Sequence, residues 1–135
     1  MGTRNRAEGD NRHLVADKEV TISTAIGNIT DGGVYQMTAN ERTVRVSTDG
    51  ATAAFTLELP PVGEAAYKIY TIEMTDHTTD DVLVKSHHGA QNIADTVDGD
   101  LGVALTATLS AANMKMVLYS DGRSWFHLTS HSSVT

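Results

Sequence analysis

The sequence predicts an all-β fold: a compact β-sandwich or small barrel of about nine short antiparallel strands, with an extended N-terminal arm. Three observations predict this fold. Thr, Val and Ile number 18, 12 and 6 among the 135 residues, and β-branched side chains favour a pleated surface over a helix. Apolar and polar residues alternate in several short segments, as in strands that bury one face. Turn signals containing Gly or Pro separate these segments.

Residues 1–13 are the predicted arm, and residues 14–135 are the predicted single β domain. The arm is almost devoid of apolar side chains, so it cannot contribute to a hydrophobic core. It also lacks the apolar stretch of a secretory signal, and no segment approaches the length of about 18 apolar residues that a membrane span needs. A membrane partner is therefore not expected.

Four strands are expected in the first half of the domain. Asp-Gly sequences that end at Gly32 and Gly50 are turn signals. Pro60 and Pro61 cannot donate ladder hydrogen bonds, so they should end the strand before them. These four strands are expected at residues 19–26, 34–38, 43–48 and 53–59.

Five strands are expected in the second half. The Ser-Asp-Gly-Arg sequence at residues 120–123 is the strongest hairpin signal, because Asp-Gly tolerates the positive φ of tight turns. Residues 64–68 are the only plausible helical turn, and no internal repeat is evident. The five strands are expected at residues 70–75, 82–85, 103–109, 114–119 and 125–129.

Charge and composition exclude several classes of function. The net charge of −7 argues against a nucleic-acid partner. The arm carries three arginines against two carboxylates, whereas the remainder carries seven basic and 15 acidic residues. Arg4, Arg6 and Arg12 of this basic arm are predicted to meet acidic patches on a partner protein. Because the chain has no Cys, disulfides, thiol nucleophiles and Cys-based zinc sites are excluded.

No catalytic, cofactor-binding or metal site is predicted. Serines such as Ser110, Ser120 and Ser124 lack a nucleophile elbow, so the protein is not expected to be an enzyme. His87 and His88 are adjacent, and neighbours on a strand point to opposite faces. Polar loop positions are favoured for them over a metal site on the symmetry axis of a trimer. The six histidines are His13, His77, His87, His88, His127 and His131.

Two acidic clusters are also expected to be solvated loops. A calcium loop needs several oxygen ligands at fixed spacing around a sharp Gly turn, and the Asp-Gly-Asp sequence at residues 98–100 is too short for that pattern. A calcium site is the less favoured alternative. The clusters consist of Asp76, Asp80 and Asp81, and of Asp95, Asp98 and Asp100.

Trp125 is the remaining candidate for partner binding. If Phe126 and Leu128 face the core, Trp125 lies on the opposite face, where it would stack on a sugar or fill a subunit interface. At the edge of a sandwich it would instead cap a second layer of the core. A place in the core or at a subunit interface is favoured, and Trp125 joins the three arm arginines as a predicted partner-binding residue.

Four stretches of the chain resemble, in order and spacing, a β-rich module of structural proteins from tailed-bacteriophage particles. Residues 55–61 form a strand that ends in Leu-Pro-Pro, and residues 67–73 form the next apolar run. Residues 91–93 match a turn, and residues 116–126 run from a strand through Ser-Asp-Gly to Trp. The module recurs in head decoration, or cement, proteins and in tail-fibre and spike proteins.

This resemblance implies a non-enzymatic virion protein, often a homotrimer, with no cofactor. Tail fibres are usually long chains, whereas here the module makes up nearly the whole chain behind a short arm. A decoration protein on the outer surface of the capsid is therefore expected. It would bind the major capsid protein and copies of itself, and it would stabilise capsomer junctions. The alternative is a tail-fibre or spike domain that binds a host-surface glycan.

Overall fold

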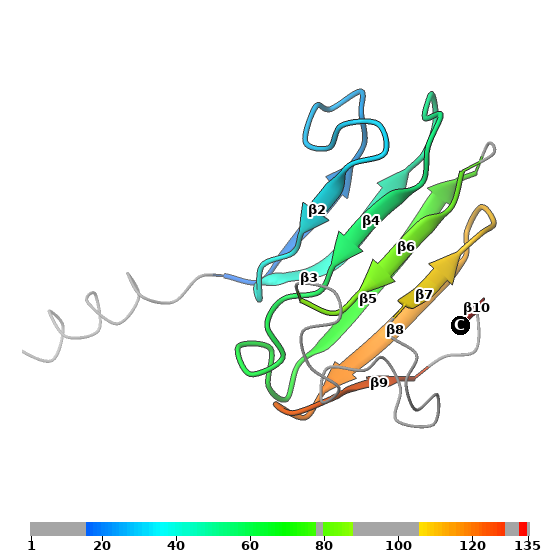
Figure 1. Cartoon of the computed structure of the whole chain (residues 1–135). Coiled ribbons are helices and arrows are strands. Elements are labelled where there is room, and N and C mark those ends of the chain that lie inside the picture. The colour runs from blue at the N-terminus through cyan, green and yellow to red at the C-terminus, as the bar shows by residue number, and fades with distance from the viewer. Residues whose placement is uncertain (1–15, 78–79, 88–105, 129–132, 135) are drawn as a thin grey trace, which may run out of the picture.

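The structure is a computed structural model that describes residues 16–77, 80–87, 106–128 and 133–134. Its elements are all strands, as the sequence predicts. Ten strands, nine of them with at least three residues, form two five-stranded sheets, which Figure 1 shows as two layers. Each sheet is open, with two edge strands, so the fold is a sandwich and the barrel alternative is wrong.

The two sheets contain strands from along the whole described chain. In spatial order, the first sheet consists of β1 (Lys18–Ile22), β3 (Glu41–Ser47), β5 (Ile69–Asp76), β8 (Lys115–Ser120) and β9 (Trp125–His127). The second sheet consists of β10 (Ser133–Val134), β7 (Thr106–Leu109), β6 (Val82–Lys85), β4 (Phe55–Glu58) and β2 (Val34–Gln36).

The strands are not all antiparallel, and this part of the prediction is wrong. β1, β3 and β5 are parallel to one another in the first sheet, and β2, β4 and β6 are parallel in the second. The chain crosses from one sheet to the other after each of the first five strands, so each sheet gains one parallel strand per circuit. Antiparallel pairing begins only at β7 and β8. A hairpin interpretation fails here because strands consecutive in sequence are not neighbours in a sheet.

One core fills the space between the sheets, and the predicted alternation is confirmed at its centre. The inward residues of β3, β4, β5, β6 and β8 are fully buried, while their neighbours along each strand are partly or fully exposed. The first sheet contributes Val44, Val46, Tyr70, Ile72, Met74, Met116, Leu118 and Trp125. The second contributes Phe55, Leu57, Val82, Val84, Ala107 and Leu109.

The predicted strand boundaries hold where Gly or Pro marks them. β4 ends at Glu58, before Pro60. The Ser-Asp-Gly-Arg hairpin joins β8 to β9 in antiparallel register, and Gly122 has a φ of 91°. The predicted helical turn at residues 64–68 is not a helix; it overlaps hydrogen-bonded turns over residues 62–67.

The connections lie at two ends of the sandwich, which follow from the strand directions. We call one the arm end: residues 16 and 17 enter there, and the connections 37–40 and 59–68 and the turn 121–124 lie there. We call the other the loop end, which holds residues 23–33, 48–54, 77, 80–81 and 110–114.

Candidate interaction surface

Trp125 is a core residue. Arg4, Arg6 and Arg12, the other predicted partner-binding residues, lie outside the described residues. The Trp125 side chain is 0% exposed, and its ring meets that of Tyr70 edge-on, with the centroids 5.5 Å apart. Of the two placements predicted for Trp125, the structure thus shows the one in the core, and in this fold Trp125 offers no surface to a partner.

The hairpin register explains why Trp125 points inward. Trp125 pairs with Ser120 on β8, and cross-strand partners point to the same face of a sheet. Ser120 is buried on the same side as Leu118, so Trp125 is buried too. Phe126 and Leu128 consequently point outward, opposite to the alternative in which they face the core. The Asp-Gly turn in the sequence implies that Ser120 pairs with Trp125. This pairing could have revealed that Phe126 and Leu128 point outward.

Two rows of apolar side chains lie on the outer face of the first sheet: the first crosses β5, β8 and β9, and the second spans β8 and the residue after β9. Ile69 is the register partner of Tyr119, and Tyr119 is that of Phe126. The Tyr119 and Phe126 ring centroids are 6.5 Å apart. In the next row, the N–H of Leu128 donates to the carbonyl of Val117 at 2.7 Å. We call these five residues the apolar rows.

The apolar rows are substantially exposed. Ile69, Phe126 and Leu128 are 46%, 36% and 53% exposed, while Val117 and Tyr119 are half-buried. Contiguous apolar side chains on a sheet surface typically mark a site of protein interaction, and aromatic residues dominate the binding energy of such sites. The rows are therefore the candidate functional site.

Tyr67 extends this surface toward the arm end. Its N–H donates to the carbonyl of Ser120 at 2.7 Å, which continues the β5–β8 ladder by one step. It is 77% exposed and has a φ of 65°. A large side chain in left-handed backbone is strained by roughly 1–2 kcal/mol. Because such strain clusters at functional positions, Tyr67 is the second feature of the candidate surface.

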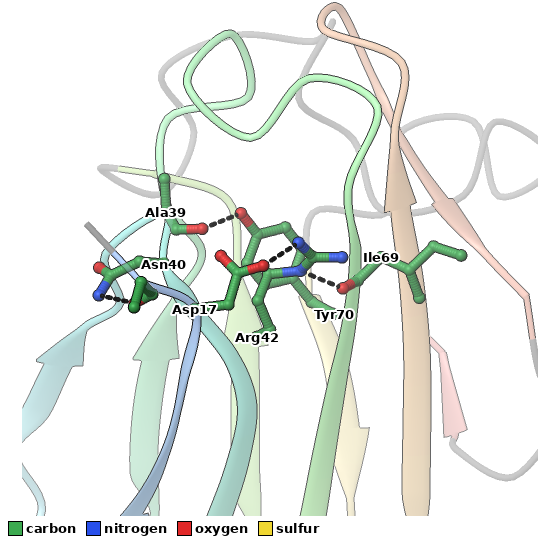
Figure 2. Close-up of polar contacts among 7 residues, drawn as sticks. Asp17, Ala39, Asn40, Arg42, Ile69 and Tyr70 are labelled. Carbon is green, nitrogen blue, oxygen red and sulfur yellow. Dashed lines mark hydrogen bonds and ion pairs between the residues drawn. The ribbon is translucent and has the colours of Figure 1, made fainter. Parts of the chain in front are cut away.

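The start of β1 is fastened beside the apolar rows by Arg42 (Figure 2). The Arg42 Nε–H donates to the carbonyl of Ile69 at 2.7 Å, and its Nη1 contacts the Asp17 carboxylate at 2.9 Å. Its guanidinium lies 5.4 Å from the centre of the Tyr70 ring, whose hydroxyl donates to the Ala39 carbonyl at 2.6 Å. Arg42 thus links the point where the chain enters the sandwich to Ile69 of the first apolar row.

Carboxylates are concentrated at the opposite end. Five lie in the loop end or, in the case of Asp76, on the last residue of β5 beside it, and no Lys or Arg occurs in the described residues of the loop end. Two have structural roles: Asp31 accepts hydrogen bonds from the hydroxyl and N–H of Thr52, which lower the pKa of Asp31, and Asp76 accepts from the N–H of Thr48 at 2.8 Å. The five are Asp31, Asp49, Asp76, Asp80 and Asp81.

The predicted chemical candidates are dispersed where the structure describes them. Within that part of the chain, no three His, Asp or Glu side chains are close enough to hold a metal ion. His77 Nε2 lies 3.3 Å from an oxygen of Asp81, and His87 Nδ1 lies 3.1 Å from the side-chain oxygen of Gln36. His13, His88, His131, Asp95, Asp98 and Asp100 lie outside the described residues.

Ser120 is structural. Its hydroxyl donates to the carbonyl of Val62 at 2.8 Å and accepts from the N–H of Gly122 at 3.0 Å, so it joins the β8–β9 turn to the β4–β5 connection. The described elements include no helix long and apolar enough to cross a membrane.

Comparisons with protein-family models, with curated proteins and with solved structures find no match to this chain.

Proposed function

We propose that this protein is a non-enzymatic structural component of a tailed-phage particle that binds the outside of the head and stabilises capsomer junctions. The sequence resemblance suggests the particle. The observation that supports it best in the structure is that two of the four resembling stretches form one contiguous unit with the connection that follows a third.

That unit joins the Leu-Pro-Pro stop to the Ser-Asp-Gly turn. β5 and β8, which hold two of the stretches, are paired along five residues each. The turn after β8 touches the connection after β4, because Ser120 donates to Val62 and a Cβ on Gly122 would lie 3.2 Å from the Cβ of Ala66. Residues 91–93, the remaining stretch, lie outside the described residues. Stretches that are separated in the sequence thus come together at the arm end of the sandwich.

The architecture suits attachment. A sandwich with one shared core transmits load as a rigid block, because protein interiors are close-packed and barely compressible. Residues 16 and 17, which follow the predicted arm in the sequence, lie at the same end as the exposed Tyr67 and the first row of apolar side chains. An arm and a face that act together would give multivalent attachment, in which modest individual affinities combine. The contribution of Arg4, Arg6 and Arg12 to such attachment stays a prediction.

The copy number of the chain in purified virions tests this proposal. Particles produced from the genome that encodes the chain would be purified and their proteins quantified by mass spectrometry against the major capsid protein. A decoration protein should occur at hundreds of copies per particle, and reconstruction of the head should place it on the outer surface. Absence from the head would overturn the proposal.

A glycan-binding tail-fibre or spike domain is the second candidate, and Tyr67 is the observation that favours it. An aromatic ring that is 77% exposed and held in strained backbone is suited to stack on the face of a sugar. A fibre protein should be present at tens of copies or fewer per particle, so the same measurement separates the two functions.

A further inference from the structure

We propose that two copies of this chain pair through the apolar rows, with the outer faces of their first sheets packed against each other around a two-fold axis. The proposal goes beyond attachment to a particle, because it concerns the free protein. It also differs from the trimer that the sequence resemblance implies.

The strand register of the surface favours another sheet as its occupant. The rows span three adjacent strands in strict register, from Ile69 across Tyr119 to Phe126. Two such faces can pack with their strands about 10 Å apart and their side chains interdigitated, as sheets do inside a sandwich. The outer face of a second copy supplies the same rows.

The charges that border the rows are of both signs, which a self-complementary contact requires. Lys115 lies on β8 on the loop-end side of the rows, opposite Glu73 of β5. Asp121 and Arg123 lie in the turn on their arm-end side. None of Lys115, Asp121 and Arg123 forms an ion pair within the part of the chain that the structure describes.

A two-fold axis through the rows brings these borders together. In an isologous interface, the residue that meets a given position on the partner is met in turn by its equivalent. With the β8 strands of the two copies running in opposite directions, Lys115 of each copy faces the turn that holds Asp121 of the other. Glu73 takes no part in this contact: β5 lies on the other side of β8 from the turn, and Glu73 forms an ion pair with Arg45 of its own chain at 3.6 Å. A partner surface of a single sign would be attracted by one half of this border and repelled by the other.

The distribution of the remaining charge permits this approach despite the net charge of −7. The four carboxylates of the loop end, and Asp76 beside it, lie beyond the last row. In the antiparallel arrangement, the two loop ends point away from each other, so their repulsion is small beyond a Debye length of about 8–10 Å.

Sedimentation equilibrium of the full chain over a range of concentrations tests the pairing. The wild-type chain should approach the mass of two copies as concentration rises. Replacing two row residues, Ile69→Thr with Phe126→Thr, should raise the dissociation constant about tenfold or more, because exposed aromatic and aliphatic anchors carry most of the affinity. Val34→Thr is the matched control: Val34 is 58% exposed on the second sheet, and its replacement should leave the constant unchanged.

A cysteine placed in the centre of the rows provides an independent measurement. The chain has no Cys, so Val117→Cys introduces one thiol close to the expected axis. Mild oxidation should convert this variant to a covalent dimer, and Val34→Cys should stay largely uncrosslinked. A chain that stays monomeric at all concentrations, a trimer, or a dimer that survives the row replacements would each overturn the pairing. None of these results bears on the copy number of the chain in virions.

Discussion

At the scale of single residues, backbone conformation at the β8–β9 turn accounts for much of the local order. Gly122 combines a φ of 91° with a close neighbour, since a Cβ there would lie 3.2 Å from Ala66. Asp121 supports the same turn by accepting the N–H groups of Arg123 and Ser124, both at 2.8 Å. These hydrogen bonds lower the pKa of Asp121. The turn is thus specified twice, by a backbone that favours glycine and by a charged acceptor.

Replacing Gly122 should therefore cost more than replacing Gly50 or Gly63. Gly122→Ala is expected to lower the free energy of unfolding by about 1–2 kcal/mol, because an L-residue is strained at this φ. Gly50→Ala isolates the conformational cost, since Gly50 has a φ of 78° but open space around it. Gly63→Ala, in open space without a positive φ, should be neutral or slightly stabilising. Urea denaturation measures all three, and equal effects at Gly122 and Gly63 would contradict the argument.

At the scale of elements, crossings between the sheets replace hairpins as the organising feature. The connection at residues 37–40 takes the chain from β2 to β3, and polar groups fasten it. Buried Glu41 accepts from the N–H of Thr38 at 2.7 Å and from the Tyr35 hydroxyl at 2.5 Å. The Tyr70 hydroxyl donates to the carbonyl of Ala39 at 2.6 Å, which ties the crossing to β5. This crossing is thus stabilised by a strand that is distant in sequence.

The stabilising contribution of Tyr70 should be lost at alkaline pH. Burial raises the pKa of Tyr70 to about 12, so the folded chain retains a proton that the unfolded chain loses near its ordinary value of 10.0. This contribution is full below about pH 10 and is lost as pH rises toward 12. Tyr70→Phe should lower the free energy of unfolding by about 1 kcal/mol at neutral pH, because a hydrogen bond is lost. The same variant should lose less additional stability than the wild type between about pH 9 and about pH 11.

Tyr119→Phe is the control for this prediction. The Tyr119 hydroxyl has no hydrogen bond in the described part of the chain. Its removal should therefore change neither the free energy of unfolding at neutral pH nor the loss of stability at alkaline pH. Denaturation curves at both pH values test the pair of variants. An alkaline loss of stability that is as steep in Tyr70→Phe as in the wild type would show that Tyr70 is not its source.

At the scale of the whole molecule, one core couples the two sheets, and the sole Trp lies within it. Trp125 packs against Tyr70 of the same sheet, and its indole N–H has no acceptor among the described residues. Within the described residues, the buried apolar side chains of both sheets belong to one cluster. Loss of packing in either sheet should therefore lower the stability of both sheets.

Unfolding should accordingly be a single transition. Trp125 fluorescence, which reports on the first sheet, and far-UV circular dichroism, which reports on all strands, should give the same midpoint in urea. Leu57→Ala in the second sheet should lower the free energy of unfolding by about 2–5 kcal/mol and shift both signals equally. A fluorescence transition that is unaffected by Leu57→Ala would mean that the sheets unfold independently.

Most strands could be predicted because their evidence is local. Alternation in β3, β4 and β5 identifies which side chains are buried, and glycines and prolines mark where strands end. The parallel order could not be predicted, since it depends on which strands pair, and residues such as Val44 and Ile72 become neighbours only across 28 positions of sequence. The candidate surface was missed for the same reason: Ile69, Tyr119 and Phe126 come from three strands.

The sequence by itself determined that this chain is all-β, where most of its strands lie and which faces of β3, β4 and β5 are buried. These properties depend on side-chain periodicity and backbone preference, which act over a few residues. Only the tertiary structure decided that the sheets are mixed, that Trp125 belongs to the core and that Phe126 lies on an exposed apolar face. These depend on strand pairing, because the register of one strand against another decides which side chains meet and which are left for a partner.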